Sequence, residues 1–156
     1  MSEIAVLVAC GKAKRDGKQP AYALYGSTLF EKSWMAASYN GDPYVMSAKH
    51  HLLHGDKRIE TYNKTLRNFT ADEKREWGET VVNQLPPHYE TVVLLGGRDY
   101  VEPIITAIDD ETTVYDPYQC TSGNGQQMTV ADRLTRAGYN GNDIENAIEY
   151  AVDPYK

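Results

Sequence analysis

The sequence predicts one α/β domain over residues 1–156, with a central, mostly parallel, four-stranded sheet between two layers of helices, a three-layer sandwich. Short apolar runs that end in glycine or polar residues indicate strands buried on both faces, as parallel strands are. Segments with apolar residues at helical spacing separate these runs, and such alternation is typical of a layered α/β fold. A chain of 156 residues is also long enough to bury a core without metals or disulfides.

Four segments have the composition of buried strands: Ile4–Cys10, Tyr44–Ala48, Thr91–Leu95 and Thr112–Tyr115. Residues 49–56 are rich in histidine and contain Gly55, so they are predicted to be too polar for a long element. Residues 57–69 are predicted to be irregular, because no periodic apolar pattern runs through them.

Two helices are predicted from paired capping residues. Thr28 and Glu31 have the spacing of a capping box and would begin a helix that ends near Asn40. Thr70 and Glu73 have the same spacing and precede the amphipathic segment Ala71–Leu85.

Three more helices follow from apolar spacing. Asp99 is expected to cap a helix that has Pro103 in its first turn, where proline is tolerated. The segment Gln119–Gly125 is predicted to be a loop, and the helix after it should end at Gly138. Asn142 is expected to cap a C-terminal helix.

Charge is distributed unevenly along the chain. The net charge is −6, yet residues 1–70 hold 10 of the 16 Lys and Arg and 6 of the 22 Asp and Glu. This basic half permits a phosphate-bearing partner, although uneven solvated charge explains it equally well. Two cysteines, no long apolar stretch and no signal-peptide pattern lead us to expect a cytoplasmic protein without a membrane partner.

Four polar segments each follow a predicted strand: Cys10–Lys14, Ser47–His50, Gly96–Tyr100 and Asp116–Gly125. The carboxyl ends of parallel strands meet at one edge of a sheet, and ligands of such sheets bind there. We therefore expect these four segments to converge on one site.

The first two segments offer groups for binding and proton transfer. Cys10, Gly11, Lys12 and Lys14 form a glycine-containing turn that would hold a phosphate or carboxylate. After the second strand come three polar groups, namely the hydroxyl of Ser47, the ammonium of Lys49 and the imidazole of His50. A histidine can shuttle protons near neutral pH.

The remaining candidates suit a heterocyclic ligand. Gly96 and Gly97 permit close approach of a ligand, and Tyr100 could stack on a ring. The polar stretch from Glu60 to Thr65 adds a carboxylate at Glu60, an aromatic ring at Tyr62 and an amide at Asn63. Asparagine pairs with base edges and tyrosine stacks on bases, so Tyr62, Asn63 and Thr65 are predicted to bind substrate.

Other chemistries receive less support. His50 and His54 have the spacing of helical metal ligands, but Gly55 argues against a helix, so no metal is expected. Neither GxxxxGK[ST] nor GxGxxG occurs, and no cofactor is expected. Cys10 or Ser47 could serve as a nucleophile, although a structural role at the strand end is favoured for Cys10.

Several of these segments together resemble a family of small, uncharacterised bacterial, archaeal and phage proteins. The resemblance covers about residues 4–130. Its pieces are Cys10–Lys14, Leu24–Phe30 (LYGSTLF), Ser47–Leu53 (SAKHHLL), Tyr62–Leu66 (YNKTL), Trp77 and Gly97–Tyr100 (GRDY).

More distantly, the order of motifs resembles the YaaA peroxide-stress family and a domain of archaeosine synthase. That resemblance implies a fold like the uracil-DNA glycosylases, binding of DNA or a nucleobase, and cleavage of an N-glycosidic bond. The water-activating G-Q-D-P-Y motif of the glycosylases is absent, with Cys10-Gly11-Lys12 at that place, and Asn63 stands where the family often has an acid.

Three functions remain open from the sequence. The leading hypothesis is a nucleobase- or nucleotide-processing enzyme, foremost a glycosylase-like N-glycosidic hydrolase on modified or damaged bases. There the lysines hold phosphate, Tyr62 and Asn63 bind the base, and Glu60 or His50 is catalytic. The alternatives are a non-catalytic DNA- or RNA-binding protein of a stress or phage-related system, and a small-molecule nucleotide or sugar-phosphate enzyme.

Overall fold

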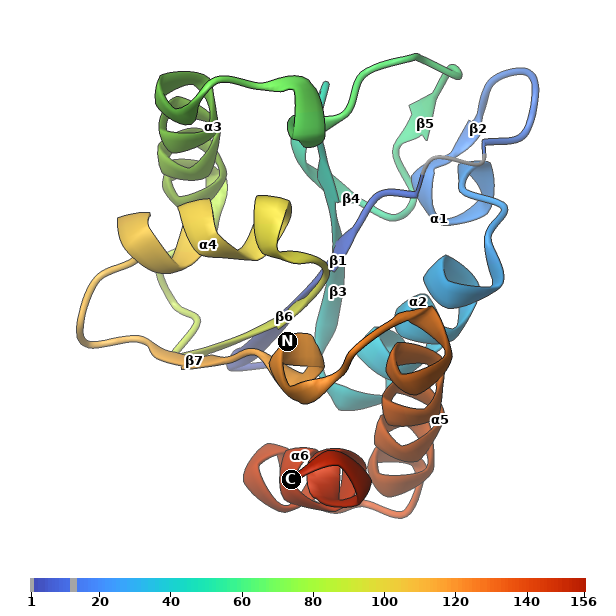
Figure 1. Cartoon of the computed structure of the whole chain (residues 1–156), viewed down its shortest axis with the longest axis vertical. Coiled ribbons are helices and arrows are strands. Elements are labelled where there is room, and N and C mark those ends of the chain that lie inside the picture. The colour runs from blue at the N-terminus through green and yellow to red at the C-terminus, as the bar shows by residue number, and fades with distance from the viewer. Residues whose placement is uncertain (1, 12–13) are drawn as a thin grey trace.

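A mixed, mostly parallel sheet forms the centre of the protein, with helices on both faces (Figure 1). The computed structural model describes residues 2–11 and 14–156. The strand order is β4-β3-β1-β6-β7, where β1 is Ile4–Ala9, β3 Asp42–Ser47, β4 His51–His54, β6 Thr91–Leu95 and β7 Thr113–Tyr115. The predicted α/β class is confirmed, but the prediction of four strands was wrong, since this sheet has five.

The additional strand is β4, in the segment predicted to be too polar. The chain reverses after Ser47 through a three-residue loop, and β4 pairs antiparallel with β3 from Ser47↔His51 to Tyr44↔His54. His51 takes a φ of 62°, the left-handed conformation that commonly closes a three-residue hairpin loop. A strand at the edge of a sheet has a partner on one side only, so it tolerates polar residues that a central strand excludes.

Side chains of the central strands point alternately into two apolar cores. On one face, Val6 and Val8 of β1 pack in a cluster with α2 (Thr28–Asn40), α5 (Asn124–Tyr139) and α6 (Ile144–Val152). On the other face, Ala5 and Leu7 belong to a second cluster, which includes residues of α3 (Ala71–Gln84) and α4 (Arg98–Ala107). Figure 1 shows these two helical layers on opposite sides of the sheet.

A small second sheet lies beside α1 (Figure 1). Its strands β2 (Gln19–Pro20) and β5 (Arg58–Ile59) pair antiparallel, and α1 is Ala21–Leu24. The segment predicted to be irregular therefore contains β5 and the first of the three 3₁₀ turns found in residues 2–11 and 14–156. These turns are Leu66–Asn68, Pro117–Cys120 and Asp153–Tyr155.

Three of the four predicted helix caps are displaced, and one is correct. Thr70 forms the predicted capping box with Glu73. The helix α2 is instead capped by Ser27, whose Oγ accepts a hydrogen bond from the backbone N–H of Phe30 at 3.1 Å. Asp143, not Asn142, caps α6 in the same way. Serine and aspartate are both strong N-caps, so in each helix the cap is a residue adjacent to the predicted one.

The start of α4 also differs from the prediction. Gly97 is its N-cap, whereas Asp99 lies inside its first turn. The helix therefore begins earlier, and Pro103 lies within it rather than in its first turn. The predicted loop Gln119–Gly125 is shortened by a 3₁₀ turn and by α5, which begins at Asn124.

Within the described residues, none of the helices has both the length and the apolar character that a membrane crossing needs.

We predict that Gly78→Ala destabilises the protein by about 1–3 kcal/mol, because overpacking forces elements apart. A Cβ at Gly78 in α3 would lie 2.4 Å from the backbone oxygen of Pro103 in α4. Urea denaturation would measure the loss. The matched control is Gly125→Ala in α5, where a Cβ meets no described atom within 4 Å, and its stability should not fall. Equal stability of the two variants would contradict the close packing of α3 on α4.

Candidate functional site

A cavity of about 590 Å³ lies at the carboxyl edge of the sheet. Its wall includes Cys10 after β1, Gly96 after β6, and the segment that contains Tyr62 and Arg67. This volume falls in the range of sites that enclose a small molecule or one unit of a polymer. The position is the one expected from the parallel strands, since the polar segments that follow β1 and β6 both reach it.

Three helices begin at the cavity wall. Ser27, the N-cap of α2, Gly97, the N-cap of α4, and Asn124, the first residue of α5, all line it. The first backbone N–H groups of a helix have no partner within the helix, and its N-terminus carries a partial positive charge. The N-caps of α4 and α5 are Gly97 and Gly123, which have no side chain to occupy these N–H groups. A bound anion would find several donors here.

The charged side chains of the cavity are mainly positive. Lys14, Lys64 and Arg67 line it, and Asp99 is the one carboxylate among its described lining residues. Asp99 is itself paired with Lys74, at 2.8 Å between Oδ1 and Nζ. The described charges and the helix N-termini therefore act in the same direction, toward binding a negatively charged group.

Tyr62 is the centre of a hydroxyl network behind the cavity. Its hydroxyl lies 2.7 Å from the hydroxyl of Tyr25 and 2.8 Å from Oγ of Ser47, and both of these partners are fully buried. The Ser47 Oγ also accepts the backbone N–H of His50 at 3.0 Å. These bonds hold the Tyr62 side chain in place, because a buried hydroxyl without a partner costs free energy.

Burial keeps the tyrosine hydroxyls of this network protonated. It raises the pKa of Tyr25 to about 12, and the neighbouring Cys10 acts in the same direction. Burial also raises the pKa of Tyr62 far above its usual value of 10. At neutral pH both side chains are therefore neutral hydroxyls that can donate and accept hydrogen bonds.

A thiol and a phenol meet in the cavity wall. Sγ of Cys10 lies 3.2 Å from the hydroxyl of Tyr100, and the backbone N–H of Cys10 donates to Met46 O. The Tyr100 ring contacts Trp77 edge to face, with the ring centroids 5.6 Å apart. Burial, followed by the nearby Cys10, raises the pKa of Tyr100 well above its ordinary value.

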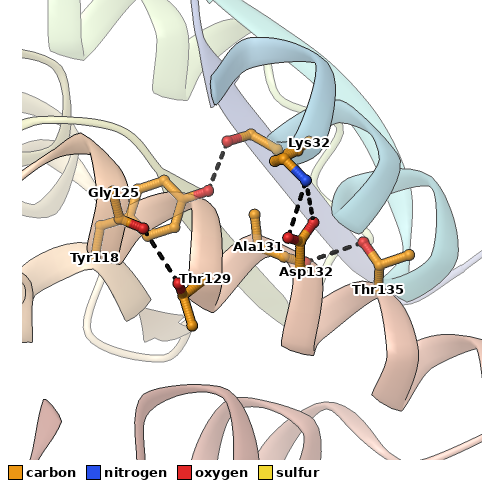
Figure 2. A network of polar contacts seen from close by, with 8 residues as sticks. Lys32, Tyr118, Gly125, Thr129, Ala131, Asp132 and Thr135 are labelled. Atoms are coloured by element: carbon orange, nitrogen blue, oxygen red, sulfur yellow. Dashed lines mark hydrogen bonds and ion pairs between the residues drawn. The ribbon is translucent and has the colours of Figure 1, made fainter. Parts of the chain in front are cut away.

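Contacts of α2 with α5 and with the 3₁₀ turn Pro117–Cys120 fix another part of the wall (Figure 2). The hydroxyl of Tyr118, which lines the cavity, lies 2.6 Å from Oγ of Ser33. Nearby, Nζ of Lys32 donates to both carboxylate oxygens of Asp132 at 2.9 Å, and so joins the two helices. Asn124 and Gln127 of α5 add two amides to the lining.

Most of the binding residues predicted from the sequence line this cavity. They are Cys10, Gly11, Lys14, Tyr62, Asn63, Thr65, Gly96, Gly97 and Tyr100. Ser47 lies behind the wall and contacts it through Tyr62. Lys12 lies outside the described residues.

Lys49, His50 and Glu60 do not line the cavity. Lys49 is exposed, with Nζ 5.9 Å from the centroid of the Tyr62 ring, and Glu60 is exposed. The His50 ring is nearly perpendicular to that of Tyr62, at 5.5 Å between centroids. Partial burial, and then the charge of Lys49, lower the pKa of His50 from its usual value, so its ring is neutral at pH 7.

Sequence reasoning missed several residues of the wall, namely Ser27, Ser33, Lys64, Arg67, Tyr118, Asn124 and Gln127. Two signals could have found some of them. Lys64 and Arg67 belong to the same basic, irregular stretch as Tyr62. Asn124 and Tyr118 belong to the segment predicted to converge on the site. Ser33 is an ordinary helix position, and only packing against Tyr118 brings it to the cavity.

We predict that Tyr62→Phe destabilises the protein by about 1–3 kcal/mol, because the buried hydroxyls of Tyr25 and Ser47 both lose their shared partner. Thermal and urea denaturation would measure this. Tyr139→Phe is the matched control, since Tyr139 is 75% exposed and should change stability little. A Tyr62→Phe variant as stable as the control would show that the hydroxyl network contributes nothing to folding.

Comparison with known proteins shows the family to which the chain belongs. Residues 5–133 match the model of a family described as "Family of unknown function (DUF6884)". No curated protein and no solved structure matches the chain. Since the match spans most of the 156 residues, the chain belongs to this family of uncharacterised proteins, as its motifs predicted.

Proposed function

We propose that the protein is a nucleobase- or nucleotide-processing enzyme that binds one nucleotide in the cavity at the carboxyl edge of the sheet. The observation that carries the proposal is the combination in one cavity of three helix N-termini, three cationic side chains, aromatic rings and amides. The positive groups suit a phosphate, whereas rings and amides suit a heterocyclic base.

The two ends of such a ligand would bind different parts of the cavity. The phosphate would bind the N–H groups at the start of α4 and α5, together with Lys64 and Arg67. The base would bind the amides of Asn63, Asn124 and Gln127, all of which line the cavity.

Stacking of the base on Tyr62 requires Lys14 to move. Nζ of Lys14 lies over the Tyr62 ring, 4.4 Å from its centroid. A cation–π contact at a solvated site contributes only about 0.5–1 kcal/mol, and a phosphate offers Lys14 a stronger partner. Transfer of Lys14 from the ring to the phosphate would therefore free the ring for the base.

The reaction we propose is hydrolysis of the N-glycosidic bond. Water oxygen bonds to C1′ of the sugar, the C1′–N bond breaks, and its electron pair leaves with the base, which takes up a proton. A carboxylate can receive the proton of the attacking water and stabilise the cationic sugar. Asp99 lines the cavity and Glu60 does not, so the geometry favours Asp99 for this role over the carboxylate predicted from the sequence.

A binding prediction tests the cavity. Lys14→Gln should weaken binding of a nucleoside monophosphate about 3- to 10-fold, because one charged hydrogen bond to phosphate is lost. Isothermal titration calorimetry at low salt measures the affinity. Lys18→Gln removes an equal charge from an exposed residue outside the cavity wall and should bind normally. If the unaltered protein binds no nucleotide, the proposed function is wrong.

A cleavage assay tests the reaction. Labelled DNA carrying uracil or another altered base is incubated with the protein, and alkali then breaks the strand at abasic sites. Asp99→Asn should abolish the breaks yet retain most binding, whereas Glu60→Gln should retain both. The reverse pattern would assign the catalytic role to Glu60. Binding without any abasic product would instead support the non-catalytic nucleic-acid-binding alternative.

A further inference from the structure

A second hollow adjoins the nucleotide cavity. It has a volume of about 230 Å³ and lies between the start of α3 and the length of α4 from Arg98 to Thr106. Asp99 lines both the hollow and the cavity, so the two are neighbours. Lys74, Arg75 and Arg98 also line the hollow, together with the carboxylate of Glu102. None of these three cations was predicted to belong to a site.

The cations of the hollow differ in how firmly they are already paired. Lys74 is bonded to Asp99, and Arg98 is bonded to Asp116, whose side chain is only 10% exposed. Among the described residues, the ion pairs of Arg75 are long, 3.4 Å to Asp72 and 3.6 Å to Glu79, and all three side chains are more than half exposed. Exposed pairs of this kind contribute little to stability, so Arg75 can turn to a phosphate at small cost.

We propose that this hollow binds the backbone phosphate next to the nucleotide held in the cavity, so that the substrate is a nucleotide within a single-stranded polynucleotide. The inference rests on the proposed function and adds to it the class of substrate. Six of the described cations then line the two adjoining sites: Lys14, Lys64 and Arg67 at the cavity, and Lys74, Arg75 and Arg98 at the hollow.

The position of Asp99 favours a strand over a free nucleoside polyphosphate. Asp99 lines both sites and therefore lies where they adjoin. In a polyphosphate, successive phosphates are joined directly, so a negatively charged group would lie against this carboxylate. In a strand, a neutral sugar separates successive phosphates and can cross the boundary without that repulsion.

The test compares three probes by fluorescence competition: an eight-nucleotide single strand, a nucleoside monophosphate and a nucleoside triphosphate. The unaltered protein should bind the strand at least 10-fold more tightly than the monophosphate. Arg75→Gln should weaken strand binding about 3- to 10-fold, leave monophosphate binding unchanged, and reduce the salt dependence of strand binding by about 0.7, the contribution of one phosphate contact. Arg136→Gln, an equal change at an exposed position near the end of α5, should alter none of these values.

The outcomes separate this inference from the proposal beneath it. Strand binding that is unaffected by Arg75→Gln, or no tighter than monophosphate binding, overturns the inference while the nucleotide site stands. A triphosphate that binds more tightly than the strand and depends on Arg75 also overturns it, in favour of a free polyphosphate. If none of the three probes binds the unaltered protein, both the proposed function and the inference are wrong.

Discussion

The parallel pairing of β1 with both of its neighbours is the constraint on which the rest of the structure depends. β1 pairs with β3 through Ala5↔Asp42 to Ala9↔Met46, and with β6 through Ile4↔Thr91 to Val8↔Leu95. Its residues Ala5 to Val8 are at most 1% exposed, so both cores hold it. Because the three strands run in one direction and in register, Cys10 after β1, Ser47 at the end of β3 and Gly96 after β6 lie at a single edge. The cavity exists because these chain segments leave the sheet together.

That arrangement requires close packing of the strands at their carboxyl ends, and it requires a hydrogen-bond partner for each buried polar group there. A Cβ at Gly96 would lie 2.7 Å from the Cβ of Ala9, so a larger residue there would separate β6 from β1 beside the cavity. Ser47 is completely buried, and its hydroxyl reaches Tyr62. The wall is therefore fixed before any ligand arrives, and preorganised polar groups bind charge more strongly than groups that must first be ordered.

The sequence allowed a good prediction of whatever depends on local pattern. Continuous apolar runs predicted the central strands, and the predicted bounds of β6 agree with the structure at both ends. The capping box of α3 was predicted from the spacing of Thr70 and Glu73. Predictions from local pattern were wrong where the surroundings of a segment determine its structure. The strand β4 was missed because an edge strand can be polar, and the N-cap of α2 is Ser27 rather than Thr28. Several residues just after strands that were predicted to bind substrate line the cavity, whereas the contacts of Ser33 and Tyr25 exist only in the folded chain.

The edge strand β4 has a consequence for how the protein behaves among its own copies. An edge strand presents backbone groups that can recruit a strand from another molecule. Here β4 is only four residues long, carries histidines at both ends, and has the N–H of Leu52 bonded to Oε1 of Gln84 at 3.0 Å. At the other edge β7 has three residues. Both edges are thus poor templates for intermolecular β-pairing, which disfavours edge-to-edge association between copies of the chain.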